Sequence, residues 1–190
     1  MPKKRVTLTA LTTAAILVAD RGGFETLTLN GVAAELDVAA STLYTHTDGL
    51  DGLKSLVAVA GTHNLTEAVR NSAIGTSGLD ALTAMAVAYR AFALDHPGQF
   101  ASTLLLPRAE NDELATANAA LLDVFVLVYR AIGLDNHEAR LAARAMRSSI
   151  HGFIALEHTT ASPSEHDAEY RYLLDALQRG LLHRHAEVAG

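Results

Sequence analysis

Residues 28–53 constrain the fold of this chain more than any other part of the sequence. Leu29, Val32, Ala33 and Leu36 recur at i, i+3, i+4 and i+7, which is the spacing of one apolar helical face. Asp37-Val38-Ala39 then interrupt the pattern, and Leu43 is the next apolar anchor. The segment therefore predicts two short helices joined by a tight turn, with a longer helix beginning near Asp48.

Short or hydrogen-bonding side chains surround Leu43 and would form the outward face of the second short helix. They are Ser41, Thr42, Tyr44, Thr45 and His46. A helix that is small and polar outside, and braced from behind by another helix, can enter the major groove of DNA. The same geometry also fits a helical hairpin that merely packs, so the pattern by itself leaves both interpretations open.

From Thr7 to Leu53, roughly a quarter of the chain, the sequence resembles the N-terminal domain of the tetracycline-repressor (TetR) family of bacterial transcription regulators. The resemblance is carried by Ala14-Ala15, Gly23, Leu27-Thr28, Val32-Ala33-Ala34-Glu35-Leu36, Val38 and Leu43-Tyr44-Thr45-His46. The last four match the L-Y-x-H signature of the family. The resemblance implies sequence-specific DNA binding by a ligand-controlled homodimer.

A second resemblance lies nearer the C-terminus. Residues His151-Gly152-Phe153-Ile154-Ala155-Leu156-Glu157 are similar to the H-G-F-x-x-L-E helix of a TetR subgroup with a so-called WHG C-terminal domain. Regulators of this family place an effector pocket among the middle helices and pair their last two helices across a two-fold axis. The resemblance implies both features for this chain.

The remaining sequence is helical in pattern, and no run alternates apolar and polar residues as a strand would. Helices are predicted from Thr7 to the Gly22-Gly23 stop, from near Asp48 to about Gly75, and over 79–96, 113–132, 137–158 and 166–183, with a Pro97-Gly98 turn before a short helix near 100–105. The predicted fold is all-α. We expect a helix-turn-helix DNA-binding domain over 1–53 and a larger helical effector-binding and dimerisation domain over 54–190.

Composition narrows the class of protein. A chain of 190 residues with 49% hydrophobic and 19% charged residues is typical of a soluble globular protein. The absence of cysteine excludes disulfides and thiolate metal sites. The N-terminus is too short and polar for a signal peptide, and the apolar stretch 119–134, broken by two charges, is too short to span a bilayer. We therefore expect a cytoplasmic protein that does not bind membranes.

The candidate DNA-binding residues are Lys3, Lys4, Arg5, Thr28, Ala40, Ser41, Thr42, Tyr44, Thr45, His46 and Lys54. Lys3, Lys4 and Arg5 could form an arm that reaches phosphates, although such a cluster is also common in a solvated tail. Tyr44 and His46 could donate to phosphates, whereas packing is the alternative role of His46. Up to Leu56 the chain has five basic and six acidic residues, and phosphate neutralisation supplies much of the affinity for DNA. Tight binding is therefore the weak point of this hypothesis.

The candidate effector-binding residues are Tyr89, Phe92, Phe100, Phe125, Tyr129 and His151. Small-molecule sites combine an apolar lining with a few polar groups, and this set has that make-up. Each of these residues alone also fits ordinary core packing. We expect a hydrophobic or aromatic, neutral effector.

Catalytic and metal-binding patterns are weak. The nine histidines form no H-E-x-x-H pair or comparable set, so we expect neither a metal site nor a cofactor, and no enzymatic activity. The predicted function is a ligand-responsive transcriptional regulator, a repressor that binds a palindromic operator as a homodimer. The alternative is a helical small-molecule-binding protein of the same fold in which DNA binding is weak or lost.

The final two predicted helices are the candidate dimer interface. The last helix has an apolar stripe at Tyr170, Leu173, Leu174, Leu177 and Leu181, and the helix before it offers Leu141, Ala142, Ala145, Ser149 and Gly152. Such a stripe also serves the core of its own chain. The remainder can be buried against the same two helices of a second copy.

Overall fold

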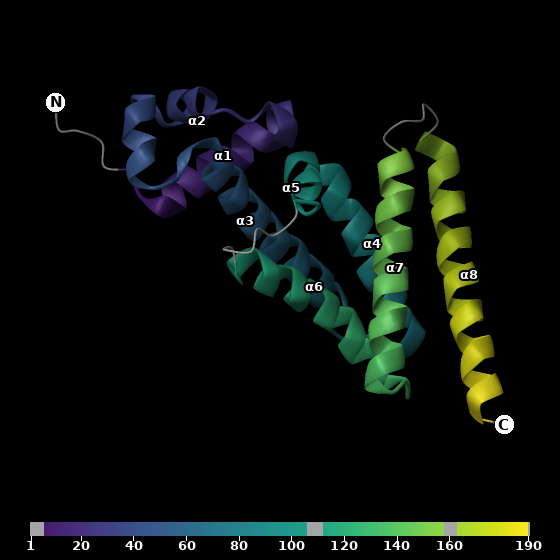
Figure 1. Ribbon diagram of the computed structural model, residues 1–190. Coiled ribbons are helices and arrows are strands. Elements are labelled where there is room, and N and C mark those ends of the chain that lie inside the picture. Colours follow the sequence, from purple (N-terminus) through teal and green to yellow (C-terminus); the bar gives the residue numbers. More distant parts are fainter. Residues whose placement is uncertain (1–5, 106–111, 158–162, 190) are drawn as a thin grey trace. The chain divides into compact units, whose positions relative to one another are not determined.

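The computed structural model describes residues 6–105, 112–157 and 163–189. Its elements are α1 (Leu8–Gly22), the 3-10 helix η1 (Phe24–Thr26), α2 (Leu29–Leu36), the 3-10 helix η2 (Ala40–Thr45), α3 (Gly49–Ser72), α4 (Gly78–Asp95), α5 (Pro97–Ser102), α6 (Asp112–Ala131), α7 (Asn136–Glu157) and α8 (Pro163–Ala189) (Figure 1). The described ranges contain no strand. The all-α prediction is confirmed.

Packing divides the chain into two compact units. The first comprises Met1–Leu65 and Phe92–Ala119, and the second comprises Thr66–Ala91 and Ala120–Gly190. Helix α3 runs through residue 53 without a break, so packing alone does not mark that position. The functional boundary between residues 53 and 54 stays a prediction.

Helix α1 begins and ends as its sequence predicts. The Thr7 hydroxyl accepts a hydrogen bond from the backbone N–H of Ala10, which caps the first turn. The helix stops at Gly23, whose φ of +94° is accessible to glycine without steric cost. Its buried face, Leu11, Ala14, Ala15 and Ala19, forms the core of the first unit with α2 and η2.

Helix α2 and the turn that follows it also match the prediction. Thr28 caps the helix by accepting from the N–H of Gly31. Val32 and Ala33 are buried, and the flanking leucines of the predicted face pack against the same core. Asp37 adopts the left-handed conformation, with φ 56° and ψ 50°, which aspartate tolerates better than most residues.

The short helix predicted after this turn is a 3-10 helix. Ala39 occupies the N-cap position and has no side-chain oxygen, so no side chain caps the segment. Thr45 donates its hydroxyl to the carbonyl of Thr42, 2.8 Å away, a local bond that competes with helical pairing. Leu43 is nonetheless fully buried, as its position in the pattern predicts.

The predicted turn at Pro97-Gly98 is instead the start of helix α5. Pro97 is the first helical residue, where proline is favoured because no N–H is needed there. Gly98 is buried against α1, and a Cβ at this position would lie 2.2 Å from the carbonyl carbon of Ala19. The glycine allows two helices to touch, and no reversal of the chain requires it.

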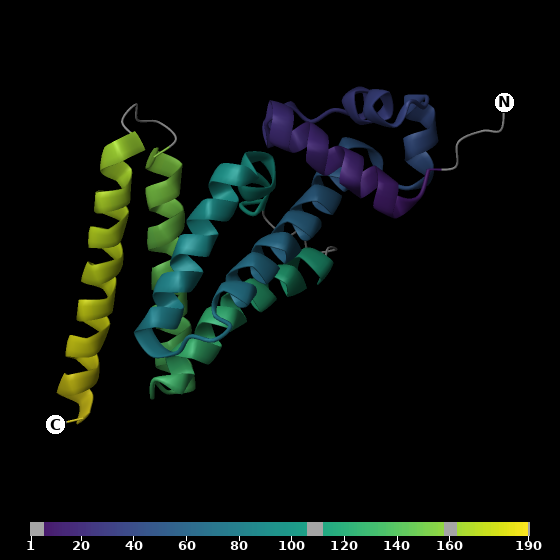
Figure 2. The same ribbon diagram turned by 180° about the vertical axis from the view of Figure 1, so that it is seen from behind.

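Helices α7 and α8 lie side by side in the second unit, and both views show the pair (Figures 1 and 2). The inward face of α7 is Ala139, Ala143, Met146, Ile150 and Ile154, all buried. Tyr170 of α8 donates its hydroxyl to the carbonyl of Ala86 on α4, 2.6 Å away. Helix α8 begins at Pro163, three residues earlier than predicted.

Helix α6 has the length that the sequence predicts and begins one residue earlier, at Asp112. It has 20 residues, and Glu113–Ala131 is long and apolar enough to cross a membrane by length and composition alone. This range begins six residues before the stretch 119–134 that the sequence analysis considered. Its face with Leu114, Leu121, Phe125 and Tyr129 is buried within the protein, as in the core helix of a globular domain.

Candidate nucleic-acid interface and effector site

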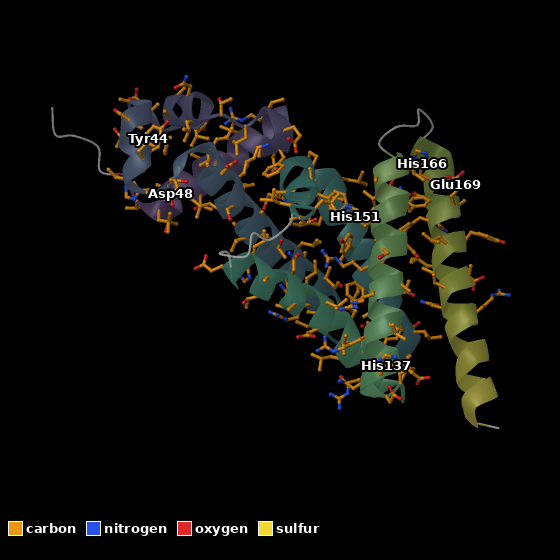
Figure 3. The ribbon with its side chains drawn as sticks, in the orientation of Figure 1. Tyr44, Asp48, His137, His151, His166 and Glu169 are labelled. Carbon is orange, nitrogen blue, oxygen red and sulfur yellow. The ribbon has the colours of Figure 1, made fainter. Side chains whose placement is uncertain are left out.

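Helix η2 presents a face of hydroxyl groups over a single buried anchor. Leu43 has no exposed surface, while Tyr44 is 61% exposed; Figure 3 labels Tyr44 on this segment. Ser41 and Thr45 are exposed, and Ala40, Thr42 and His46 are half-buried. The six candidate residues of this segment thus lie together on one short element. Their contact with DNA stays a prediction.

The cations that the structure describes around this element are paired with carboxylates. Between positions 6 and 65 the basic side chains are those of Arg21 and Lys54. The Arg21 guanidinium lies 2.6 Å from a Glu35 oxygen, and the Lys54 ammonium lies 3.0 Å from Glu25 and over the Phe24 ring. Binding a phosphate through Lys54 would therefore require exchange of its partner.

The other candidate DNA contacts have separate positions. The Thr28 hydroxyl oxygen accepts the capping bond from Gly31, which leaves its own O–H available to donate. Lys3, Lys4 and Arg5, the predicted basic arm, lie outside the described residues.

The six effector candidates are buried or half-buried, but they belong to both units. Phe92 and Phe100 lie in the first, and Tyr89, Phe125, Tyr129 and His151 lie in the second. Within the second unit the Tyr89 hydroxyl and His151 Nδ1 are 3.2 Å apart; Figure 3 labels His151 on α7. A shared pocket for all six residues stays a prediction.

Burial shapes the protonation of this polar pair. It lowers the pKa of His151 to about 4, and the charge of Arg147, one helical turn away, acts in the same direction. Burial also raises the pKa of Tyr89, against a smaller lowering by Arg147, with which Tyr89 forms a hydrogen bond. At neutral pH both groups are uncharged, so His151 and Tyr89 can offer an effector hydrogen bonds without a net charge of their own.

An ion cluster that no sequence pattern indicates joins α4, α7 and α8. Arg90 donates to both carboxylate oxygens of Glu157, at 2.8 and 2.5 Å, and to Asp167 at 2.6 Å. His166 Nδ1 lies 3.4 Å from Glu157; Figure 3 labels His166 near the start of α8. These partners are 67 and 77 residues apart along the chain, so no local spacing could reveal the cluster.

The sequence is similar to those of known proteins. Residues 82–177 match the family model described as the Tetracyclin repressor-like, C-terminal domain. The chain is 32% identical over 146 residues to an HTH-type transcriptional regulator of Mycobacterium tuberculosis, Rv0681, covering 76% of this chain and 67% of that protein. It is 27% identical over 166 residues to the HTH-type transcriptional regulator YobS of Bacillus subtilis, covering 87% and 86%.

A solved structure supports the fold independently of these sequence matches. A TetR variant from Acinetobacter baumannii, crystallised with minocycline, superposes with a TM-score of 0.73 at 17% identity, covering 94% of this chain and 97% of that one. At 17% identity this structural similarity establishes only the all-helical fold. The sequence matches establish the relationship to the family.

Proposed function

The chain belongs to the TetR family of DNA-binding, ligand-responsive transcriptional regulators, and we propose that it is a repressor that binds a palindromic operator as a homodimer. The observation that carries the proposal is the exposed hydroxyl face of η2, held over the fully buried Leu43. An element of this kind, braced by the helix before it, suits the major groove.

In this proposal Ser41, Thr42 and Thr45 read base edges. Hydroxyl groups can bond to several bases, and the threonine methyl groups suit the methyl group of thymine. Thr28, Tyr44, His46 and Lys54 would contact the phosphate backbone, together with Lys3, Lys4 and Arg5. The amide groups at the start of a helix can also bind phosphate without a charged side chain.

The proposed effector is small, largely hydrophobic and uncharged. This is supported by the buried aromatic residues of α4 and α6 and by the neutral Tyr89–His151 pair. Residues 151–157 lie within the matched family segment, and we extend the proposal to the WHG subgroup on their H-G-F-x-x-L-E pattern. We also propose a cytoplasmic protein that acts by binding and without catalysis.

The second candidate function is effector binding by a protein whose affinity for DNA is weak. It is favoured by one observation, the pairing of Arg21 and Lys54 with carboxylates. Paired cations neutralise phosphates less readily, and phosphate neutralisation supplies most non-specific affinity.

The two candidates are separated by selecting duplexes from a random library with the full-length protein and footprinting the product. Operator binding predicts a two-fold symmetric sequence and a symmetric footprint, because an isologous dimer presents two copies of η2. In the Thr42→Ala/Thr45→Ala double variant, the sequence preference should weaken, each lost base contact costing about 1–3 kcal/mol.

Thr76→Ala is the matched control. Thr76 is exposed and donates its hydroxyl to the carbonyl three residues earlier, 3.0 Å away, as Thr45 does, yet it lies in the turn between α3 and α4. Its replacement should leave the preference unchanged. A selected sequence without two-fold symmetry, or none at all, would favour the second candidate function.

A further inference from the structure

One carboxylate on α1 binds the first turn of α5. Asp20 accepts two hydrogen bonds from the same residue, one from the backbone N–H of Gln99 at 2.9 Å and one from its side-chain amide at 2.7 Å. His96 Nδ1 lies 3.5 Å from the same carboxylate. The Asp20 side chain is only 18% exposed, so these bonds are largely shielded from water.

The chain of bonds continues to a third helix. The side-chain oxygen of Gln99 accepts from the Asn64 amide of α3 at 2.7 Å. Because an ionised carboxylate can only accept, it fixes the Gln99 amide with its NH₂ toward α1 and its oxygen toward α3. Asp20 therefore sets the direction of the whole relay.

Two glycines allow α5 to pack in close contact with both α1 and α3. A Cβ on Gly98 would lie 2.2 Å from backbone atoms of Ala19 on α1. A Cβ on Gly61 of α3 would lie 2.9 Å from the Ser102 hydroxyl and 3.0 Å from the Gln99 carbonyl. Helix α5 is thus a wedge between α1 and α3, and the Asp20–Gln99–Asn64 relay fixes its register.

The two helices that hold the wedge also flank the DNA-reading segment. Leu11 of α1 and Leu53 and Val57 of α3 belong to the same buried cluster as Leu43, the anchor of η2. A change in the distance between α1 and α3 would therefore shift the buried residues that pack beneath η2.

We propose that Asp20 is a positioning residue for operator binding, which it controls by holding α5 between α1 and α3. This inference rests on the proposed operator binding. Asp20 touches no DNA in this scheme. Its effect is to hold η2 in the orientation that reads bases.

The direction in which DNA affinity changes when Asp20 is replaced distinguishes a positioning role from a simple effect of charge. The chain carries a net charge of −6 at pH 7, so removing an acidic residue reduces repulsion of DNA and should leave affinity equal or higher. In Asp20→Asn the new NH₂ group faces the Gln99 amide, and a donor meets a donor. Positioning therefore predicts weaker binding from a change that electrostatics alone would favour.

The test uses full-length protein and the duplex that the wild-type protein selects from a random library, with a scrambled duplex for comparison. For Asp20→Asn we expect about tenfold weaker binding to the selected duplex, which corresponds to 1.4 kcal/mol, and unchanged binding to the scrambled one. Asp37→Asn is the matched control, since it removes the same charge from an exposed turn residue and asparagine also tolerates the left-handed backbone.

A compensating variant tests the relay itself. In Asp20→Asn/Gln99→Glu, residue 20 donates to a carboxylate at residue 99, which also accepts from Asn64, while the backbone bond to residue 20 is kept. Net charge equals that of the wild type, and we expect operator affinity to return to within twofold of it. Gln99→Glu alone places two carboxylates together and should bind more weakly than the double variant.

Stability is measured on the same samples so that a merely structural role is recognised. Asn64→Ala, at an exposed position, is a milder variant that should weaken operator binding in the same direction. The inference is overturned if Asp20→Asn binds as tightly as Asp37→Asn, if only its thermal midpoint falls, or if the double variant is not rescued. A wild-type protein that selects no duplex would instead refute the proposed function.

Discussion

His151 is held neutral by its surroundings on α7 and α4. Its Nδ1 lies 3.2 Å from the Tyr89 hydroxyl, and the two rings meet edge to face. Because Tyr89 also hydrogen-bonds Arg147, its oxygen can accept from the guanidinium while its O–H donates to His151. Burial and the Arg147 charge then oppose protonation of the imidazole.

This arrangement predicts a loss of stability in mild acid. The pKa of His151 is about 4 in the folded protein against 6.5 in the unfolded chain. Below pH 6.5 the unfolded chain therefore binds a proton that the folded protein does not, so the free energy of unfolding falls as pH decreases toward 4. His151→Gln should show a smaller fall over this interval in urea unfolding.

His137→Gln, an exposed histidine on the same helix, controls for the loss of an imidazole as such. The difference in unfolding free energy between wild type and His151→Gln, measured at pH 7, 6, 5 and 4, is the relevant quantity. A difference that does not change with pH would show that His151 titrates alike in both states.

Single residues differ in how far the sequence could predict them. The left-handed Asp37 and the capping Thr7 and Thr28 were predictable because their roles depend on neighbours in the chain. Asp20 and Gln99 were not, since their partner lies 79 residues away. Likewise, Arg147 and Tyr89 meet only because α4 and α7 pack together. The positions of candidate DNA contacts follow local spacing, and the buried polar network does not.

Helices were predicted well where local signals mark their ends and less well where tertiary contacts decide. Caps and glycines placed α1, α2 and α4 within one or two residues. At α5 the Pro97-Gly98 pair indicated a turn, whereas the helix begins at Pro97 and Gly98 packs on α1. At η2 the residue pattern was right, but the missing cap at Ala39 and the Thr45 hydroxyl produced a 3-10 helix.

Adding the missing cap should stabilise η2. Ala39 already has the extended backbone of an N-cap residue, with φ −71° and ψ 140°, and its side chain is exposed. Ala39→Ser supplies an oxygen for the free N–H groups of the first turn, and we expect a gain of about 1 kcal/mol in unfolding free energy. Thermal and urea unfolding measure it.

Ala39→Val is the control, because it adds bulk at the same place without an acceptor and should not stabilise the protein. If Ser and Val behave alike, the cap is not what this segment lacks. Operator affinity should rise with the serine variant, since a better ordered η2 loses less entropy when it binds DNA.

The basic arm should dominate the salt dependence of DNA binding. With Arg21 and Lys54 paired to carboxylates, Lys3, Lys4 and Arg5 are the main remaining cations of the N-terminal part. The slope of log affinity against log salt is about −0.9 per phosphate neutralised. Replacing all three residues with alanine should flatten the slope and weaken selected and scrambled duplexes alike.

Titrations at several salt concentrations measure this slope for each protein. Arg70→Ala is the control, since that exposed cation is paired to Glu67 within α3 and lies in the second unit. An unchanged slope in the triple variant would remove the arm from the DNA interface.

At the scale of the whole molecule, the predicted dimer stripe of α8 belongs largely to the core: Leu173 and Leu177 are half-buried, and the side chain of Leu181 lies outside the described residues. Tyr170 and Leu174 are 3% and 4% exposed in a single chain, so they serve the core, and Leu174→Asp would disrupt the fold before it informed on assembly. Among the side chains of α7 and α8 whose burial the structure describes, the large apolar ones left exposed are Leu141, Leu156 and Tyr172, at 51%, 69% and 78%. A two-fold pairing of α7 and α8 would bury them in a four-helix contact.

Gly152 offers a clean test of this proposed dimer. It is exposed, and a Cβ built on it meets no atom within 4 Å in the single chain. A Cβ at this position therefore fits the monomer, and replacing a mid-helix glycine with alanine should stabilise the helix by about 1 kcal/mol. If α7 faces a second copy, Gly152→Glu places two buried charges in the interface and should dissociate the dimer, which sedimentation equilibrium detects.

The two variants at position 152 have opposite expected effects, which separates a change of the helix from a change of the interface. Gly152→Ala should raise the thermal midpoint and leave the dimer intact, whereas Gly152→Glu should give a folded monomer by circular dichroism that no longer protects its palindrome. Loss of the dimer and loss of operator protection should occur together, because each half-site needs its own copy of η2 at a fixed spacing. A Gly152→Glu protein that sediments as a stable dimer would place the interface away from this face of α7.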